Sequence, residues 1–201
     1  MKGKMFESEY EEAFIQLLQS HGWGNYSCGE ELHRQYTDTL LESDLRNYLE
    51  QRYAGKNLNS ADYDRIIANL RNVSGVNDYL TSLNAFNLYR DGFDFVFTDG
   101  RDAPFKLEYI DFEHPEKNIF RVVNQFEMHQ GQENRRPDIL LFINGIPVCI
   151  IELKNPTDEK ATIRDAHTQI TVRYRRDIPS LLKYCALACI SDGSNSRLGT
   201  V

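Results

Sequence analysis

The sequence predicts an α/β (α+β) domain in which helices flank a mixed central β-sheet. Apolar residues recur at helical spacing through much of the first 85 residues. From Asn84 onward Tyr, Phe, Val and Ile become frequent, and the apolar spacing shortens towards two. No internal repeat or interdomain linker separates the two parts. We therefore expect one domain over 1–201, with a mainly helical part at 1–85 and a sheet-bearing core at 86–201.

The composition is typical of a soluble, folded protein. Of the 201 residues, 41% are hydrophobic and 26% are charged, which excludes disorder of the whole chain. No stretch approaches the roughly 18 apolar residues of a membrane span, and the N-terminus lacks the apolar segment of a secretory signal. The four cysteines are few, and three lie in apolar runs, which favours reduced buried thiols over a disulfide framework. We expect a cytoplasmic protein with no membrane partner.

Charge is distributed unevenly along the chain. The net charge of −7 argues against a nucleic-acid partner. Residues 121–201, however, carry 11 basic and 9 acidic side chains. Binding of a polyanion requires a local basic face and not a basic whole chain, so a nucleic-acid partner stays open.

Three amphipathic patterns predict helices in the first part, over residues 5–21, 39–54 and 60–72. Gly22 supplies a C-terminal stop for the first helix, and Asn59 with Ser60 supplies a cap for the third. Residues 24–38 are polar and predict irregular structure. The apolar stripe of the first helix, which begins at Met5, comprises Phe6, Tyr10, Phe14, Leu17 and Leu18.

In the second part, short apolar spacing predicts strands over residues 93–97, 105–112, 120–127, 138–143 and 147–154. Thr157 is expected to cap a helix over 158–174. A short helix at 178–183 then precedes an apolar run, 185–190, that is typical of a core strand. The turn residues 191–195 close that run.

The hairpin signal of Asn144-Gly145, between two apolar strands, determines which charged side chains can meet. Glu152 and Lys154 are two residues apart and therefore share a face of the second strand. With a two-residue loop, Asp138 lies on the opposite face. With a three-residue loop, in which Gly145 is left-handed, Asp138 lies diagonal to Glu152 on the same face. We predict the three-residue, bulged loop.

Asp138, Glu152 and Lys154 are the candidate catalytic residues. Two carboxylates on one face can share a divalent cation, and Mg²⁺ prefers such oxygen ligands. A Mg²⁺ held there would polarise a scissile phosphate and lower the pKa of a bound water, while Lys154 orients that water or stabilises developing charge. The competing interpretation is an ordinary exposed Glu–Lys pair at a sheet edge, and the spacing alone leaves both open.

The motif Pro137-Asp138 followed by Glu152-Leu153-Lys154 resembles the PD-(D/E)xK nuclease signature. The surroundings are similar to the N-terminal nuclease domain of the restriction (motor) subunit, the R subunit, of type I restriction-modification enzymes. The similar phrases are Tyr109–Asn118, Val122–Phe126, Arg136–Pro147, Ile151–Pro156, Ile178-Pro179, Tyr184 and Ser191–Gly193. This resemblance implies a restriction-endonuclease-like core.

The resemblance also implies roles for individual residues. Asp138 and Glu152 correspond to metal ligands, the backbone carbonyl of Leu153 to a further ligand, and Lys154 to the catalytic lysine. The family tends to place a helical glutamate, a further metal ligand, ahead of a Gly-aromatic pair, which here is Gly22-Trp23 at the end of the first helix. Here that glutamate is Glu11, with the alternatives Glu9 and Glu12.

A Gln-xxx-Tyr motif on the helix after the Glu-x-Lys strand also belongs to this family. Gln169 matches it, but Tyr174 stands one residue too far along, and Arg173 occupies the expected tyrosine position. We expect DNA contacts from Gln169, Tyr174, Arg135, Arg136, Arg173, Arg175 and Arg176, with Lys183 nearby. The alternative for the cations near Tyr174 is a solvated helix end whose charges offset the helix dipole.

The resemblance therefore implies a Mg²⁺-dependent endonuclease domain that cuts double-stranded DNA in defence against foreign DNA, with Mn²⁺ as a substitute for Mg²⁺. Its partners would be the modification (methyltransferase) and specificity subunits of a type I complex. ATP is expected for the full-length enzyme only, because no phosphate-binding loop occurs here and the motor would follow Val201. Two other functions stay open, a noncatalytic DNA-binding or subunit-docking module and a stand-alone repair-type nuclease.

Overall fold

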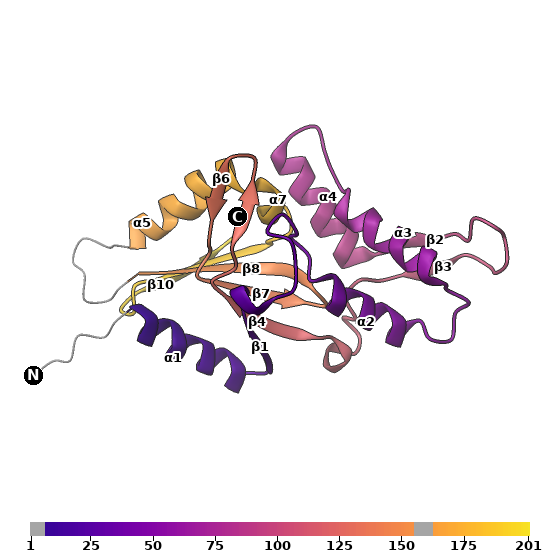
Figure 1. The fold of residues 1–201 in the computed structure, drawn as a ribbon, viewed down its shortest axis with the longest axis horizontal. Coiled ribbons are helices and arrows are strands. Elements are labelled where there is room, and N and C mark those ends of the chain that lie inside the picture. Colours follow the sequence, from indigo (N-terminus) through magenta and orange to yellow (C-terminus); the bar gives the residue numbers. More distant parts are fainter. Residues whose placement is uncertain (1–6, 155–162) are drawn as a thin grey trace, which may run out of the picture.

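The structure, a computed structural model, describes residues 7–154 and 163–201. Its centre is a six-stranded sheet with the order β1-β4-β7-β8-β9-β10 (Figure 1). The β1–β4 and β8–β9 pairs are parallel and the other pairs are antiparallel, so the predicted mixed sheet is confirmed. The strands are β1 (Asn25–Cys28), β4 (Phe120–Asn124), β7 (Ile139–Ile143), β8 (Ile146–Leu153), β9 (Leu187–Ser191) and β10 (Ser196–Gly199).

Helices cover both faces of this sheet (Figure 1). On one face, α1 (Glu7–Ser20) packs Ile15 against apolar side chains of β4, β7 and β8. The other face is covered by a continuous helical run that buries Ala166 and Ile170. This run consists of α5 (Ile163–Thr168), the π-helix η3 (Gln169–Tyr174) and α6 (Arg175–Asp177). Alternate residues of β7 and β8 therefore enter two different cores.

A third core lies beside the β7–β8 turn. It combines α2 (Glu42–Arg52), α3 (Ser60–Arg71) and α4 (Asp78–Asp91) with the small sheet β2 (Phe93–Phe95) and β3 (Phe105–Leu107). Two helices were expected here and are confirmed, including the Asn59 cap, which forms a capping box with Asp62. The change of character expected at Asn84 is wrong, because α4 begins at its Asn77 cap and continues to Gly92 (φ 66°). Its buried face is too narrow to give a clear helical pattern.

The first helix ends as expected. The Trp23 and Gly22 N–H groups donate to the carbonyls of Leu18 and Gln19, and Gly22 has the left-handed φ of 99° that this ending requires. Tyr10, Phe14 and Leu18 pack towards the sheet. Leu17 is 54% exposed and was wrongly assigned to the apolar stripe. Met5 and Phe6 lie outside the described residues, as does the expected cap Thr157.

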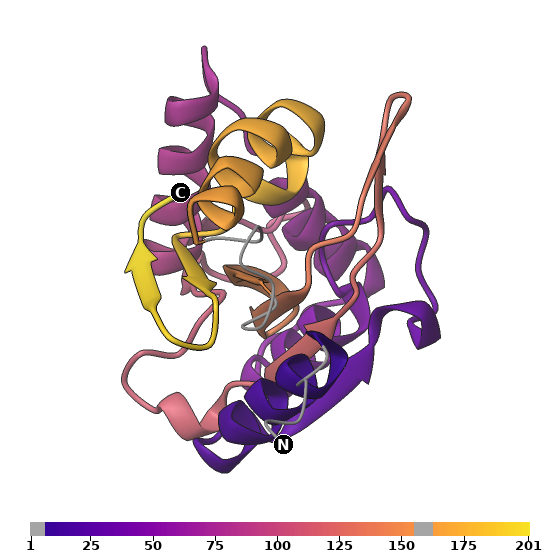
Figure 2. The same ribbon diagram turned by 90° about the vertical axis from the view of Figure 1, so that its left-hand side faces the viewer.

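Several short elements were not expected. The polar strand β1 lies in the segment predicted to be irregular, and β10 follows the turn after β9. Residues 108–112 are not strand as predicted, because the loop after β3 closes around the buried Asp111, which accepts hydrogen bonds from the Glu113 and His114 N–H groups. The hairpin of β5 (Met128–Gln130) and β6 (Glu133–Arg135) projects from the domain in Figure 2. The remaining elements are η1 (Gly29–Glu31), η2 (Pro115–Lys117) and α7 (Pro179–Leu182).

The cysteines lie as unpaired thiols within the fold. All four are free, and Cys149 and Cys185 are buried. Burial raises the pKa of Cys149 to about 12, so this thiol stays protonated at neutral pH. Within 7–154 and 163–201, no helix is long and apolar enough to cross a membrane.

The turn between β7 and β8 differs from the prediction. Ile143 pairs with Ile146, so the loop has two residues, Asn144 and Gly145, with φ of 50° and 77°. Buried Asn144 fixes this turn, because its side chain accepts from the Ile119 N–H and donates to the Tyr109 carbonyl. A bulge follows, and Leu141 pairs with Cys149 instead of Val148. The predicted three-residue loop is wrong, and the bulge lies within the strands.

The π-helix η3 explains the unusual spacing of Gln169 and Tyr174. A π-turn accommodates one extra residue relative to an α-helix. The two side chains therefore lie on one face although five positions separate them, and Gln169 Nε2 donates to Tyr174 Oη over 2.7 Å. Val172 and Arg173, at the middle of the turn, are exposed.

Replacement of Gly145 by Ala is expected to destabilise the fold strongly. An added Cβ would lie 2.2 Å from the Leu41 carbonyl oxygen, in addition to the cost of a left-handed alanine. We expect a loss of about 3 kcal/mol or more in the free energy of unfolding, measured by denaturant titration. Gly131→Ala is the matched control, because Gly131 has a similar φ of 63° but no atom within 4 Å of the added Cβ, so about 1 kcal/mol is expected. Equal losses in the two variants would refute the role of the close approach.

Deletion of Val172 is expected to leave the domain folded, because removing one residue converts the π-turn into an α-helix with Gln169 and Tyr174 four positions apart. The melting temperature should stay within about 5 °C of the wild type. A matched deletion of Asp64, an exposed residue in the regular helix α3, should lower it much further, because it rotates buried Ile66 and Ile67 out of the core. Similar losses in both deletions would contradict this explanation of the π-helix.

Candidate active site

Asp138 and Glu152 meet at one end of the central sheet. Ile139, the first residue of β7, pairs with Ile151 of β8. Because the two strands are antiparallel, the next pair in this register is Asp138 and Glu152. The two side chains then share the face that the α5–η3–α6 run covers. The prediction that they lie on one face is confirmed, although the bulge within the strands produces it and not the loop. The Asp138 Oδ2 atom accepts the Leu153 N–H over 2.7 Å.

Glu152 is only 1% exposed and is held by three neighbouring side chains. Its Oε1 atom accepts from Lys154 Nζ over 3.1 Å and from Gln169 Nε2, and its Oε2 atom accepts from Tyr174 Oη over 3.1 Å. Lys154 Nζ also donates to Gln169 Oε1 over 3.0 Å. The structure therefore brings together four of the expected residues, including Tyr174, whose spacing departs from the family motif.

Burial makes both carboxyl groups weak acids. Removal from water raises the pKa of Glu152 to about 8, and the nearby charge of Asp138 adds to that effect. Removal from water also raises the pKa of Asp138 to about 6, partly offset by the Leu153 N–H and by the charge of Lys154. The single positive charge of Lys154 therefore does not offset the cost of burying the two ionised carboxyl groups of Asp138 and Glu152. The exposed Glu–Lys pair considered from the sequence is excluded, because Glu152 is buried and the Lys154 side chain is only 15% exposed.

Ser191 fixes the position of Lys154. The Lys154 N–H donates to the Ser191 carbonyl over 2.8 Å, and Ser191 Oγ lies 2.7 Å from Tyr10 Oη. Ser191 is fully buried. It therefore links the end of β8 to α1 on the far side of the sheet. Neither Tyr10 nor Ser191 was assigned to the site from the sequence, although Ser191 belongs to one of the similar phrases.

Of the three candidate glutamates on α1, Glu11 is the one directed towards this end of the sheet. It is 8% exposed, whereas Glu9 and Glu12 are exposed. Its carboxylate accepts from Asn124 Nδ2 over 2.6 Å and from Gln125 Nε2 over 2.7 Å. The charge of Glu11 contributes to the raised pKa of Asp138. The sequence did not identify Asn124 and Gln125 individually, but both lie in the phrase Val122–Phe126.

The arginines expected to contact DNA are mostly paired with acids. Arg135 and Arg176 both contact Asp177, at 2.6 Å and 2.5 Å, and Arg136 lies 3.6 Å from Glu30. Arg173 and Arg175 are exposed, and neither forms an ion pair with the described residues. The two therefore keep positive charges available at the surface.

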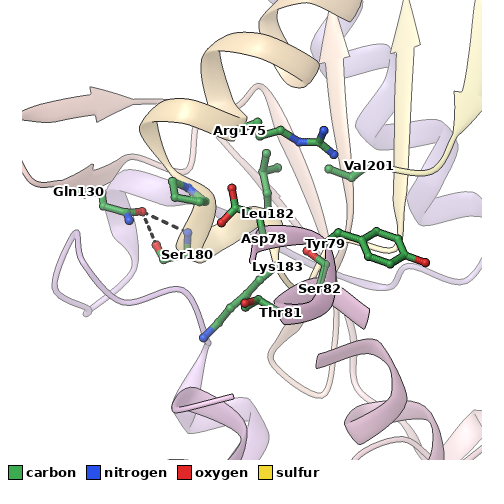
Figure 3. Close-up of a pocket in the computed structure, with 11 residues that line it drawn as sticks. Asp78, Tyr79, Thr81, Ser82, Gln130, Arg175, Ser180, Leu182, Lys183 and Val201 are labelled. Atoms are coloured by element: carbon green, nitrogen blue, oxygen red, sulfur yellow. Dashed lines mark hydrogen bonds between the residues drawn. The ribbon is translucent and has the colours of Figure 1, made fainter. Parts of the chain in front are cut away.

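A separate cavity of about 180 Å³ lies between α4 and α7, shown in Figure 3. Arg175 and Lys183 line it together with Val201. The ammonium group of Lys183 donates to the Arg71 and Val73 carbonyls, so its charge serves the fold. None of the candidate catalytic residues lines this cavity.

The carboxylates of Asp138 and Glu152 and the backbone carbonyl of Leu153 are the oxygen atoms that could hold a divalent cation here. Among the described residues, no three His, Cys, Asp or Glu side chains are grouped as a complete ligand set. Burial disfavours the charged form of both carboxyl groups, and the charge of Asp138 adds to this effect at Glu152. The N–H and C=O of a strand residue point to the same side, so the Leu153 carbonyl is directed to the side of Asp138. Two carboxylates and one carbonyl suit a hard cation that keeps several waters, such as Mg²⁺.

Comparison with known proteins gives consistent matches. A family model described as "Type I restriction enzyme R protein N terminus" matches residues 4–201. The chain is 32% identical to the type I restriction enzyme HindI endonuclease subunit of Haemophilus influenzae over 97% of this chain and 19% of that protein. It is 31% identical to the putative type I restriction enzyme MjaIXP endonuclease subunit of Methanocaldococcus jannaschii, over 94% of this chain and 19% of that protein.

A third relative, the type I restriction enzyme EcoprrI endonuclease subunit of Escherichia coli, is 37% identical over 52% of this chain and 32% of that protein. The chain thus spans about a fifth of the length of the first two relatives. The family match covers nearly all of it. The chain therefore belongs to the family of type I restriction enzyme R protein N-terminal domains.

Proposed function

We propose that this chain is the nuclease domain of a type I restriction enzyme R subunit and cuts double-stranded DNA with Mg²⁺. The observation that carries the proposal is the arrangement of Asp138, Glu152 and Lys154 at one end of the sheet, with both carboxylates on one face. Relatives named as endonuclease subunits support the same function.

Asp138, Glu152 and the Leu153 carbonyl would hold the cation. When bound there, Mg²⁺ or Mn²⁺ would supply a Lewis acid that polarises the scissile phosphate and lowers the pKa of an attacking water. Glu11 lies beside this centre and would contribute charge. The raised pKa values support the assignment, because a bound cation would offset the cost of burying two ionised carboxylates.

Lys154 would act on the reacting phosphate. Its ammonium group is held between Glu152 and Gln169, and these two contacts fix its direction. Held in this way, a cationic donor can orient an attacking water or stabilise negative charge on phosphorus without reorganisation. Gln169 and Tyr174 would keep Glu152 and Lys154 in place. Exposed Arg173 and Arg175 would supply phosphate contacts, which are independent of sequence.

The remaining parts of the proposal concern the complete protein. The chain would work in the cytoplasm with modification and specificity subunits, and the specificity subunit would select the target. ATP would be required only by a motor in the complete R subunit. The noncatalytic docking module would be favoured if substitutions in the site left DNA cleavage unchanged.

Asp138→Ala and Lys154→Ala in the complete enzyme are expected to lower DNA cleavage by about 10³-fold or more, because each removes a group that acts on the phosphate. ATP hydrolysis should persist, since these residues belong to the nuclease domain. Both rates can be measured on the same preparations with plasmid DNA. Lys106→Ala, which changes an exposed lysine on β3, is the matched control and should cleave normally. Wild-type cleavage by either site variant would refute the assignment.

The stability of the metal-free chain is expected to fall as pH rises from about 5 to 8. In this window folded Glu152, with a pKa of about 8, binds a proton that the unfolded chain has released, so each rise in pH favours unfolding. Glu152→Gln should flatten this dependence and raise the free energy of unfolding by roughly 2 kcal/mol at pH 8.5, with no gain at pH 4. Denaturant titrations at a series of pH values measure the pH dependence and the gain in the free energy of unfolding at pH 8.5.

Mg²⁺ should stabilise the wild type at pH 8.5 more than the Glu152→Gln variant, because the cation replaces the proton. Glu116→Gln, an exposed change on η2, is the matched control and should keep the wild-type dependence of the free energy of unfolding on pH. If this pH dependence is also unchanged in the Glu152→Gln variant, the Glu152 carboxyl is not the titrating group.

A further inference from the structure

Glu11 is an almost buried carboxylate that has no cationic partner in the described part of the chain. It is 8% exposed, and among the residues of 7–154 and 163–201 it forms no ion pair. Buried acids are usually paired with a cation, because the loss of hydration is costly. Among the described residues, two neutral amides donate to its oxygens, one from Asn124 and one from Gln125.

Gln125 adopts a backbone conformation that is unusual for its type. Its φ of 52° is left-handed, which residues other than glycine, asparagine and aspartate seldom adopt. In this conformation the Gln125 N–H donates to the Asp138 carbonyl over 2.8 Å, while its side chain reaches the Glu11 carboxylate over 2.7 Å. One residue thereby joins the first helix to the start of β7. Strained residues of this kind cluster at functional sites.

The surroundings hold this conformation in place. Gly29 packs so closely that a Cβ on it would lie 2.4 Å from the Gln125 carbonyl oxygen. Asn124, the other donor, accepts a hydrogen bond from Tyr26 Oη over 3.0 Å, which fixes the direction of its amide. Both donors to Glu11 are therefore positioned by neighbours from β1 and the following turn.

The choice of amides has an electrostatic consequence. An arginine or lysine in their place would orient Glu11 but would also cancel its charge. Amides orient the carboxylate through hydrogen bonds and leave its full negative charge to act on its surroundings. The negative charge of Glu11 therefore remains available near Asp138, on which it acts.

We propose that Asn124 and Gln125 are positioning residues that hold the Glu11 carboxylate, with its charge not neutralised, near Asp138, and so raise the affinity of the Asp138–Glu152 centre for a divalent cation. This inference rests on the proposed function, because it requires that the centre binds a cation. Outer partners of this kind commonly change metal affinity by about 10- to 100-fold. A purely structural amide pair would only attach α1 to β4, and its loss would lower stability without changing cation binding.

The test is calorimetric titration of the chain with Mn²⁺ at fixed pH, together with thermal unfolding. Gln125→Gly removes the amide and suits a left-handed backbone, so the melting temperature should stay within about 3 °C. Mn²⁺ affinity should fall by about tenfold. Asn124→Leu, which keeps the size of the side chain but not its donor, should also weaken binding. Glu12→Gln, an exposed change on the same helix, is the matched control and should bind normally.

A double variant of Glu11 and Gln125 shows whether Gln125 changes Mn²⁺ affinity through Glu11. If Gln125 acts through Glu11, the double variant Glu11→Gln with Gln125→Gly should bind Mn²⁺ no more weakly than Glu11→Gln alone. Additive losses, or wild-type affinity in Gln125→Gly, would overturn the positioning role. If the wild type does not bind Mn²⁺, or if Asp138→Ala leaves binding unchanged, the proposed metal centre fails and this inference fails with it. Binding that Asp138→Ala abolishes and Gln125→Gly leaves intact overturns the positioning role alone.

Discussion

The burial of Glu152 directly beside Asp138 is the constraint on which the site depends. Removal from water raises the pKa of both carboxyl groups, and the charge of Asp138 raises the pKa of Glu152 further. The fold compensates with donors from several elements. Lys154 follows the same strand, Gln169 and Tyr174 come from the π-helix, and the Leu153 N–H serves Asp138. The positions of β7, β8 and η3 must therefore be correct together, since a shift of any one leaves a buried acid without its donors.

The β7–β8 hairpin shows how a local turn and a distant pairing are reconciled. Asn144 is buried and bound to the 109–119 loop, which requires a two-residue turn. That turn alone would direct Asp138 away from Glu152, because one residue of register exchanges the two faces. The bulge at Val148 adds the missing residue and restores the shared face. The shared face was therefore predicted correctly together with an incorrect loop, because the additional residue lies within β8 and not in the turn.

Strong periodicity made α1, α2 and α3 predictable, and the NG turn with its flanking apolar runs made β7 and β8 predictable. The edge strand β1 was missed because it is polar, and helix α4 was missed because it buries only Ala85 and Tyr89 and so lacks a clear apolar stripe. Within the site, the spacing of Gln169 and Tyr174 argued against a joint role because an α-helix was assumed, and a π-turn is not visible in residue spacing. The contribution of Gln125 depends on a positive φ, which its residue type does not indicate.

Charge balance explains why a divalent cation belongs to the proposed function. Glu152 contacts one ammonium group, that of Lys154, while Asp138 and Glu11 add two further carboxylates nearby, so the centre is acidic once its carboxyl groups are ionised. Arg135, Arg136 and Arg176 do not correct this, because acids already pair with them. A DNA phosphate approaching such a centre meets repulsion of like charges. A bound cation reverses the local charge and stabilises both ionised carboxylates, so the residues that make the metal-free centre unfavourable are the ones that suit it to hold a cation against a phosphate.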